Sequence, residues 1–220
     1  MRTIKVTGTG RLKLRPDTTV ISLTLEGTYP EYGEALRSSS RDAENIKNLL
    51  TDFGFERSDL KTLEFSVDAE YESYREDDVY KQRFVGYKYR HVMKVSFKSD
   101  NERLGRVLYA LARCPEKPEL RLSSTVGDPE AVRNELLGKA VEDAAAKASV
   151  LTRAAGVTLG EIVSMDHSAA QLELEVRPVN RLLAAEKSFG ALASSGSFDL
   201  NVEPDDINVS DTVTVIWEIG

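Results

Sequence analysis

Residues 3–14 alternate without a break between apolar or glycine positions and polar positions. The first set is Ile4, Val6, Gly8, Gly10, Leu12 and Leu14. A period of two matches a β-strand that buries one face, and a helix cannot place such a pattern on one side. The chain is therefore expected to begin with a strand of an open sheet. Pro16-Asp17 supplies a turn and alternation resumes at Ile21, so we expect residues 2–27 to form a hairpin.

Two further alternating segments carry opposite charges. Residues 63–71 place acidic side chains opposite the apolar ones, and residues 85–97 place lysine and arginine there. Opposite charges on facing strands favour antiparallel pairing, so these segments are expected to form a second hairpin. Residues 119–126, 158–176 and 212–219 are expected to add three strands, the last two in one sheet.

Three segments repeat their apolar residues every three or four positions, as amphipathic helices do: residues 31–53, 101–114 and 129–155. The third opens with Asp128-Pro129, a capping carboxylate before a proline at the first helical position. Its inner face is mostly alanine, which predicts close packing on the sheet. We therefore predict an α+β fold, a single domain over residues 1–220, whose antiparallel-rich mixed sheet carries the three main helices mainly on one face.

The charge balance excludes several classes of partner. With 29 Lys and Arg against 36 Asp and Glu, the chain has a formal charge of −7 and lacks the cationic surface that general nucleic-acid binding requires. No stretch approaches the roughly 20 apolar residues of a membrane span. The first residues enter the alternation directly, without the apolar run of a secretory signal, so we expect a cytoplasmic protein.

Few residues in the chain offer chemistry. Cys114 is the only cysteine, which excludes an intrachain disulfide and a cysteine-based zinc cluster, and we expect an inert buried thiol. His91 lies on the apolar face of its strand and is expected to be a core residue rather than a ligand or base. Gly8-Thr9-Gly10 lacks the third glycine of a dinucleotide fingerprint, so a close backbone contact is the preferred interpretation.

Other candidate sites are also incomplete. The alternating acidic residues from Asp199 to Asp205 lack the glycine and the glutamate of a calcium loop, which favours a solvated loop. No serine or cysteine stands in a nucleophile motif. We therefore expect no catalytic residue, no cofactor and no metal, and a protein that is not an enzyme.

Five tyrosines gather around the second predicted hairpin: Tyr71, Tyr74, Tyr80, Tyr87 and Tyr89. Amphipathic aromatic side chains at a sheet edge suit either core packing or a protein interface. The sequence leaves both interpretations open.

Residues 177–206 form an irregular arm without clear periodicity. Its apolar residues are the predicted interface: Val179, Leu182, Leu183, Phe189, Leu192 and Phe198. So many apolar side chains would make an exposed patch of the size that marks an interaction surface. We expect the arm to pack against another subunit or to fold back over the sheet.

Several short motifs follow one another along the chain. They are Val6-Thr7-Gly8-Thr9-Gly10, Pro16-Asp17, Gly86-Tyr87, Asp128-Pro129, Lys139–Ala144, Gly156-Val157 and Leu159-Gly160. In this order they resemble the SIMPL-domain family, which is mostly bacterial and largely uncharacterised, over about residues 3–219. The resemblance implies an α+β domain, a tendency to oligomerise, and a link to oxidative-stress defence. For distant animal members it also implies assembly of signalling complexes. The family supplies no agreed catalytic residues, and many of its members are exported, which the missing leader argues against here.

Two hypotheses of function follow. The first is a non-enzymatic protein that self-associates, as a homo-oligomer, or that scaffolds other proteins. The alternative is a small-molecule binding protein or enzyme with a site under the arm at residues 177–206, where His91 or the carboxylates at Asp199–Asp206 would perform acid–base chemistry.

Overall fold

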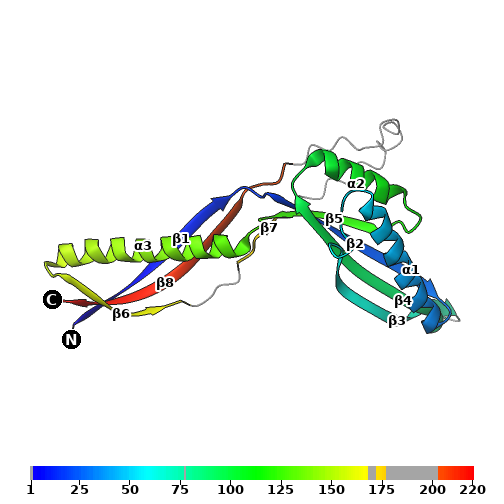
Figure 1. The fold of residues 1–220 in the computed structure, drawn as a ribbon. Helices are drawn as coiled ribbons and strands as arrows, with labels where there is room; N and C mark the ends of the chain where they lie inside the picture. Colours follow the sequence, from blue (N-terminus) through cyan, green and yellow to red (C-terminus); the bar gives the residue numbers. More distant parts are fainter. Residues whose placement is uncertain (1, 77, 168–171, 177–202) are drawn as a thin grey trace. The chain divides into compact units, whose positions relative to one another are not determined.

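The computed structural model describes residues 2–76, 78–167, 172–176 and 203–220 (Figure 1). In chain order the elements are β1 (Thr3–Leu14), β2 (Thr18–Tyr29), α1 (Tyr32–Thr51), β3 (Lys61–Glu76), β4 (Val79–Lys98), α2 (Asn101–Arg113), β5 (Glu119–Thr125), α3 (Pro129–Ala155), β6 (Leu159–Asp166), β7 (Glu175–Val176) and β8 (Ile207–Ile219). Helices combined with antiparallel strands confirm the α+β class. None of the described helices has both the length and the apolar character needed to cross a bilayer.

The described chain divides into two compact units. The first unit contains the residues up to Asp17 together with Thr125–Val176 and Pro204–Gly220, and the second is built on Thr18–Ser124. Compactness does not measure whether the two units unfold together, so the single domain over residues 1–220 stays a prediction.

The sheet of the first unit has the order β1-β8-β6. The central strand β8 is antiparallel to β1, from Thr3 opposite Glu218 to Leu14 opposite Ile207, and it is antiparallel to β6 as well. The expectation that residues 158–176 and 212–219 share one sheet is confirmed for β6 and β8, whereas β7 belongs to the other sheet. α3 runs along β1 and β8, and its alanines pack on their apolar face (Figure 1). The core of this contact is Val6, Ala140, Ala144, Ala148, Val213, Val215 and Trp217.

The glycines of β1 lie directly beneath the backbone of α3. A Cβ at Gly8 would overlap the carbonyl oxygen of Ala140 and lie 2.8 Å from the Cβ of Ala144. A Cβ at Gly10 would overlap the carbonyl oxygen of Leu136. Two backbones approach this closely only where no side chain separates them, which confirms the interpretation of these glycines as a close contact.

Both ends of α3 follow the signals in the sequence. The side chain of Asp128 accepts a hydrogen bond from the backbone N–H of Ala131 at 2.9 Å, and Pro129 occupies the first helical position. The helix ends at Gly156, whose φ of 68° lies in the left-handed region that glycine tolerates. The predicted bounds of this helix are confirmed.

The second unit places β3, β4, β2 and β5 side by side in that order. β4 pairs antiparallel with both β2 and β3, which confirms the hairpin predicted from opposite charges. α1 and α2 share one core with this sheet, while α3 belongs to the first unit, so the three helices are divided between two sheets. The fully buried centre of this core is Ile21, Leu23, Leu25, Ile46, Leu50, Tyr89, Met93, Val95, Val107 and Leu111.

The hairpin predicted for residues 2–27 is wrong. Both strands exist, but β1 pairs with β8 and β2 pairs with β4. The turn residue Asp17 instead bonds to the segment before α3: its N–H donates to the oxygen of Thr125 at 3.1 Å, and its carboxylate accepts the N–H of Gly127 at 2.7 Å. Alternation identifies a strand but does not identify its partner, because a strand can pair with any segment that presents a matching face.

We predict that Gly8→Ala lowers the free energy of unfolding by about 2–3 kcal/mol, because α3 must move away from β1 to admit the new methyl group. Gly138→Ala is the matched control: a Cβ there meets nothing within 4 Å, and alanine should stabilise the helix by about 0.5–1 kcal/mol. Denaturant titration of both variants measures the difference. Equal stability of Gly8→Ala and the wild type would contradict the close contact.

Candidate interaction surface

The predicted interface residues of the arm lie outside the described residues: Val179, Leu182, Leu183, Phe189, Leu192 and Phe198. The same holds for Asp199 and Asn201 of the acidic loop. Among the residues that the structure does describe, no three or more histidine, cysteine or acidic side chains gather closely enough to hold a metal ion. The site is therefore built from other elements.

His91 is half-buried between β3 and α1, with both ring nitrogens engaged. Nδ1 lies 3.2 Å from the hydroxyl of Ser39, and Nε2 lies 2.9 Å from the hydroxyl of Thr62. The ring of Phe65 meets the imidazole edge to face at 5.2 Å. Burial lowers the pKa of His91, and the charge of Lys47 acts in the same direction. The residue is a satisfied packing histidine, as predicted.

Cys114 closes α2 as a buried residue, as predicted. Its Sγ donates to the carbonyl oxygen of Leu111 at 3.1 Å. Burial raises the pKa of the thiol, so the nucleophilic thiolate is disfavoured.

In the first unit, α3 covers the open edge of β1. The backbone N–H of Thr9 donates to Oδ2 of Asp143 at 2.7 Å. Lys147 pairs with the same carboxylate at 2.6 Å and donates to the carbonyl oxygen of Thr7 at 3.3 Å. The bonds from Lys147 and Thr9 hold the pKa of Asp143 below its ordinary value. Side chains of the helix thus occupy the backbone groups that another strand would need.

In the second unit, part of β4 has a strand neighbour on one side only among the residues that the structure describes. β2 accompanies β4 as far as the pair Tyr29 and Tyr87, whereas β3 continues along it to the pair Glu76 and Val79. Residues 79–86 therefore form, with β3, a two-stranded ribbon that extends beyond β2. Gly86 marks the end of the wider sheet, because a Cβ there would lie 2.5 Å from the carbonyl oxygen of Tyr29.

A bulge at Val85 directs aromatic rings to one face of this ribbon. Pairing shifts between Glu70–Gly86 and Tyr71–Phe84, so Phe84 and Tyr87 reach the same side. Their centroids are 5.3 Å apart, and the row continues to Tyr71 at 5.7 Å from Phe84 and to Tyr32 at 5.5 Å from Tyr87. Tyr32, at one end of this row, is the first residue of α1. The rings therefore continue the face of the sheet that α1 covers, beyond the N-terminal end of the helix.

Eight large apolar side chains of this hairpin are between 40% and 78% exposed. We call them the hairpin surface: Leu63, Phe65, Tyr71, Tyr74, Val79, Tyr80, Phe84 and Val85. The two interpretations of the tyrosines each hold for some of them, because Tyr89 lies in the core whereas Tyr71, Tyr74 and Tyr80 are exposed. Phe84 and Val85 were missed, because simple alternation assigns Val85 to the buried face. The sequence did contain a signal for the bulge: Gly86 interrupts the strand pattern directly after Val85, and a glycine inside a strand often marks a bulge.

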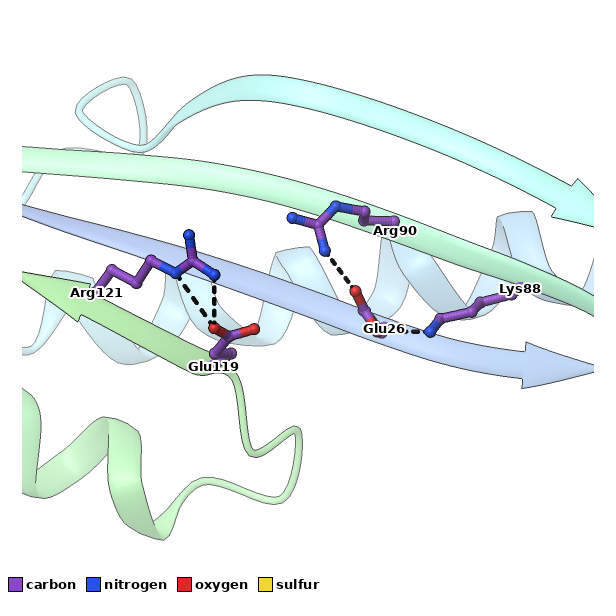
Figure 2. A network of polar contacts seen from close by, with 5 residues as sticks. All are labelled: Glu26, Lys88, Arg90, Glu119 and Arg121. Carbon is purple, nitrogen blue, oxygen red and sulfur yellow. Dashed lines mark hydrogen bonds and ion pairs between the residues drawn. The ribbon is translucent and has the colours of Figure 1, made fainter. Parts of the chain in front are cut away.

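The opposite face of the sheet is charged. Glu26 on β2 pairs with Lys88 at 2.8 Å and with Arg90 at 2.6 Å on β4, and Glu119 pairs with Arg121 on β5 (Figure 2). The hydrogen bond from Lys88, with help from Arg90, lowers the pKa of Glu26. Charged side chains that already have partners favour hydration of this face. The register places Phe65, Tyr71, Tyr80 and Phe84 on the other face of the hairpin, whereas Tyr74 and Val79 lie on the charged face.

We predict that His91 makes stability depend on pH. Burial keeps its folded-state pKa below the ordinary 6.5, so the unfolded chain binds the proton more readily. The free energy of unfolding should therefore decrease as the pH falls below about 6.5, and His91→Gln should remove that part of the decrease. Denaturant titrations of both proteins from pH 8 to pH 5 measure the difference. A constant gap between the two curves over this range would contradict the prediction.

Two curated relatives match almost the whole chain. The 26 kDa periplasmic immunogenic proteins of Brucella melitensis biotype 1 and of Brucella abortus strain S19 are each 25% identical over 218 residues, which is 98% of this chain and 84% of the relative. Both relatives are described as periplasmic, which overturns the expected cytoplasmic location. That expectation depended only on the first residues of the sequence, and the fold of the domain does not depend on where the protein is located.

The family comparison covers the same extent. The family model SIMPL, described as a protein of unknown function (DUF541), matches residues 4–217. This range begins in β1 and ends near the end of β8, the two strands that pair with each other. It therefore includes residues of both units. The chain belongs to the SIMPL family.

Proposed function

We propose that this protein is a non-enzymatic interaction protein that self-associates through the hairpin surface. The observation that carries the proposal is the exposure of eight large apolar side chains on the β3–β4 hairpin, with Tyr80 78% exposed. Four of them, Phe65, Tyr71, Tyr80 and Phe84, share one face of the hairpin, and monomeric proteins rarely leave large apolar patches in water. A two-stranded ribbon is also marginally stable by itself, and a contact with another subunit would stabilise it.

The composition of the hairpin surface supports a protein partner. Aromatic residues are enriched at protein interfaces because each buries a large area while losing little conformational freedom. The rings of Tyr71, Phe84 and Tyr87 already support one another edge to face, so the surface is largely formed before a partner arrives. Preorganised side chains lower the entropic cost of association.

The chemistry around His91 supports a role without catalysis. The hydroxyl nearest to its Nδ1 belongs to Ser39, which is 1% exposed and therefore out of reach of a substrate. Thr62 binds the other ring nitrogen. An imidazole with both nitrogens engaged by neighbouring hydroxyl groups has no free position from which to act as a base.

We further propose that the protein acts in the periplasm. The support is the description of two relatives as periplasmic proteins, each matched over 98% of this chain.

We predict that Tyr80→Ser combined with Phe84→Ser reduces the native mass in solution to that of one chain. Both side chains are exposed, so the change should remove apolar contact area and leave the core of the second unit intact. Light scattering after size-exclusion chromatography measures the mass. Val150→Ser is the matched control, since Val150 is 65% exposed on α3 in the first unit. A wild type that is monomeric at 100 µM, or a double variant that keeps the wild-type mass, would refute the proposal.

A further inference from the structure

The first sixteen residues of the chain carry a concentrated positive charge. They contain five lysine and arginine residues and no aspartate or glutamate, although the whole chain has a formal charge of −7. Three of the five, Lys5, Arg11 and Lys13, lie on β1, and all three are exposed. They stand at odd positions of the strand and alternate with the valine and the glycines that face α3. The positive charge therefore lies on the face of the first sheet that α3 does not cover.

Hydroxyl side chains lie between the charged residues on the same face. Residues directly opposite each other on two antiparallel strands point to the same side of the sheet. The register of β1 and β8 therefore brings five hydroxyl side chains together: Thr7, Thr9, Ser210, Thr212 and Thr214. The hydroxyl oxygens of Thr7 and Thr214 are 2.9 Å apart. By contrast, no hydrogen bond joins the hydroxyl group of Thr9 or Thr212 to another described residue, so both are available to a ligand.

A hollow of about 430 Å³ lies at one end of this face. Its lining residues are Arg11, Leu12, Lys13, Asn208, Val209 and Ser210. The polar side chains among them can all donate hydrogen bonds, and none of the lining residues is a carboxylate. Lys13 pairs with Asp206 at 3.0 Å, whereas no described residue forms an ion pair with Arg11. The hollow is therefore suited to an anionic group, whose oxygens the planar guanidinium of Arg11 can bind in pairs.

The other carboxylates of this sheet lie away from the basic residues of β1. Glu218 lies opposite Thr3 at the far end of the strand, and Asp166 is on β6, on the other side of β8. An anionic ligand is therefore attracted to β1 rather than to β6. Lys5 and Arg11 are about 20 Å apart along the strand. The charged and hydroxyl side chains thus follow an extended path, which suits a polymer better than a small anion.

We infer that this face of β1 and β8 binds an extended anionic polysaccharide. Acidic groups of the polymer bind Lys5, Arg11 and Lys13, and its hydroxyl groups bond to the threonine hydroxyls between them. A nucleic acid is a poorer match, because single strands are bound by aromatic side chains that stack on bases. On this face the described strands β1 and β8 present Ile216 and no aromatic side chain. The site lies in the first unit, so it does not depend on self-association through the hairpin surface.

Paired removal of charges tests the inference. Lys5→Gln combined with Arg11→Gln removes two positive charges from the face without breaking an ion pair between described residues. Lys94→Gln combined with Lys98→Gln is the matched control, because both lysines are exposed on β4 in the second unit and the net charge changes equally. Isothermal titration calorimetry at low salt measures the binding of polygalacturonate, an acidic polysaccharide. The dissociation constant should rise about tenfold in the first variant, as expected for two exposed ion pairs, and should not change in the control.

A second variant tests the hydroxyl groups while all charges stay in place. Thr9→Val combined with Thr212→Val removes two hydroxyl groups, and valine keeps the branched shape that suits a strand. The dissociation constant for polygalacturonate should rise about fivefold, as expected for the loss of two neutral hydrogen bonds. Dextran, a neutral polysaccharide, should not bind measurably, and high salt should weaken the binding of polygalacturonate. If one variant has a lowered melting temperature, the other variant still tests the face.

Four outcomes would overturn the inference. A wild type that does not bind polygalacturonate has no such site. Equal losses in the charge variant and in its control would assign the binding to net charge rather than to this face. Wild-type affinity in the threonine variant would mean that the face does not recognise a sugar. Tighter binding of a single-stranded DNA oligonucleotide than of polygalacturonate would identify a different class of polyanion. None of these outcomes bears on self-association, since the hairpin surface belongs to the second unit.

Discussion

The passage of the α3 backbone directly over Gly8 and Gly10 determines how the first unit is built. A sheet of three strands offers little apolar area, and a single helix covers it, so the two must meet closely to exclude water. Glycine on β1 and alanine on α3 remove the side chains that would hold them apart. The same closeness lets Asp143 reach the N–H of Thr9. Packing and edge protection are therefore consequences of one contact.

The second unit resolves the same problem differently. Its core is larger and contains long aliphatic and aromatic side chains from two helices and the sheet, so it does not need a backbone contact for stability. Its hairpin is longer than β2 beside it, and the surplus length exposes aromatic rings such as Tyr71, Tyr80 and Phe84. In the first unit, side chains of α3 cover the β1 edge, whereas the second unit leaves aromatic side chains of its hairpin exposed.

Local patterns in the sequence predicted most of the elements but few of their partners. The helix from Pro129 to Ala155 could be predicted because capping and termination are encoded within a few residues. The close contact at Gly8 could be predicted because glycine weakens a strand and is typical of places where another backbone passes close by. The pairing of β1 with β8 could not, since Thr7 and its partner Thr214 are 207 positions apart. Nothing near either residue specifies the other.

The candidate surface was found only in part, for a related reason. The number of tyrosines around the second hairpin indicated an aromatic cluster, but the sequence did not distinguish Tyr89 in the core from Tyr80 at the tip. That distinction depends on where β2 ends relative to β4, which is a property of three strands together. The bulge at Val85 then changes which side chains share a face, and alternation cannot anticipate an inserted residue.

The burial of Cys114 bears on whether copies of this chain would become linked by disulfides. In an oxidising compartment, such as the periplasm proposed here, a lone exposed thiol on a self-associating protein would link neighbouring copies by disulfides. Cys114 is 5% exposed, and the hydrogen bond from its thiol to the carbonyl oxygen of Leu111 holds it against α2. In the self-association proposed above, contacts between copies would then remain noncovalent, and the size of an assembly would follow the protein concentration through mass action.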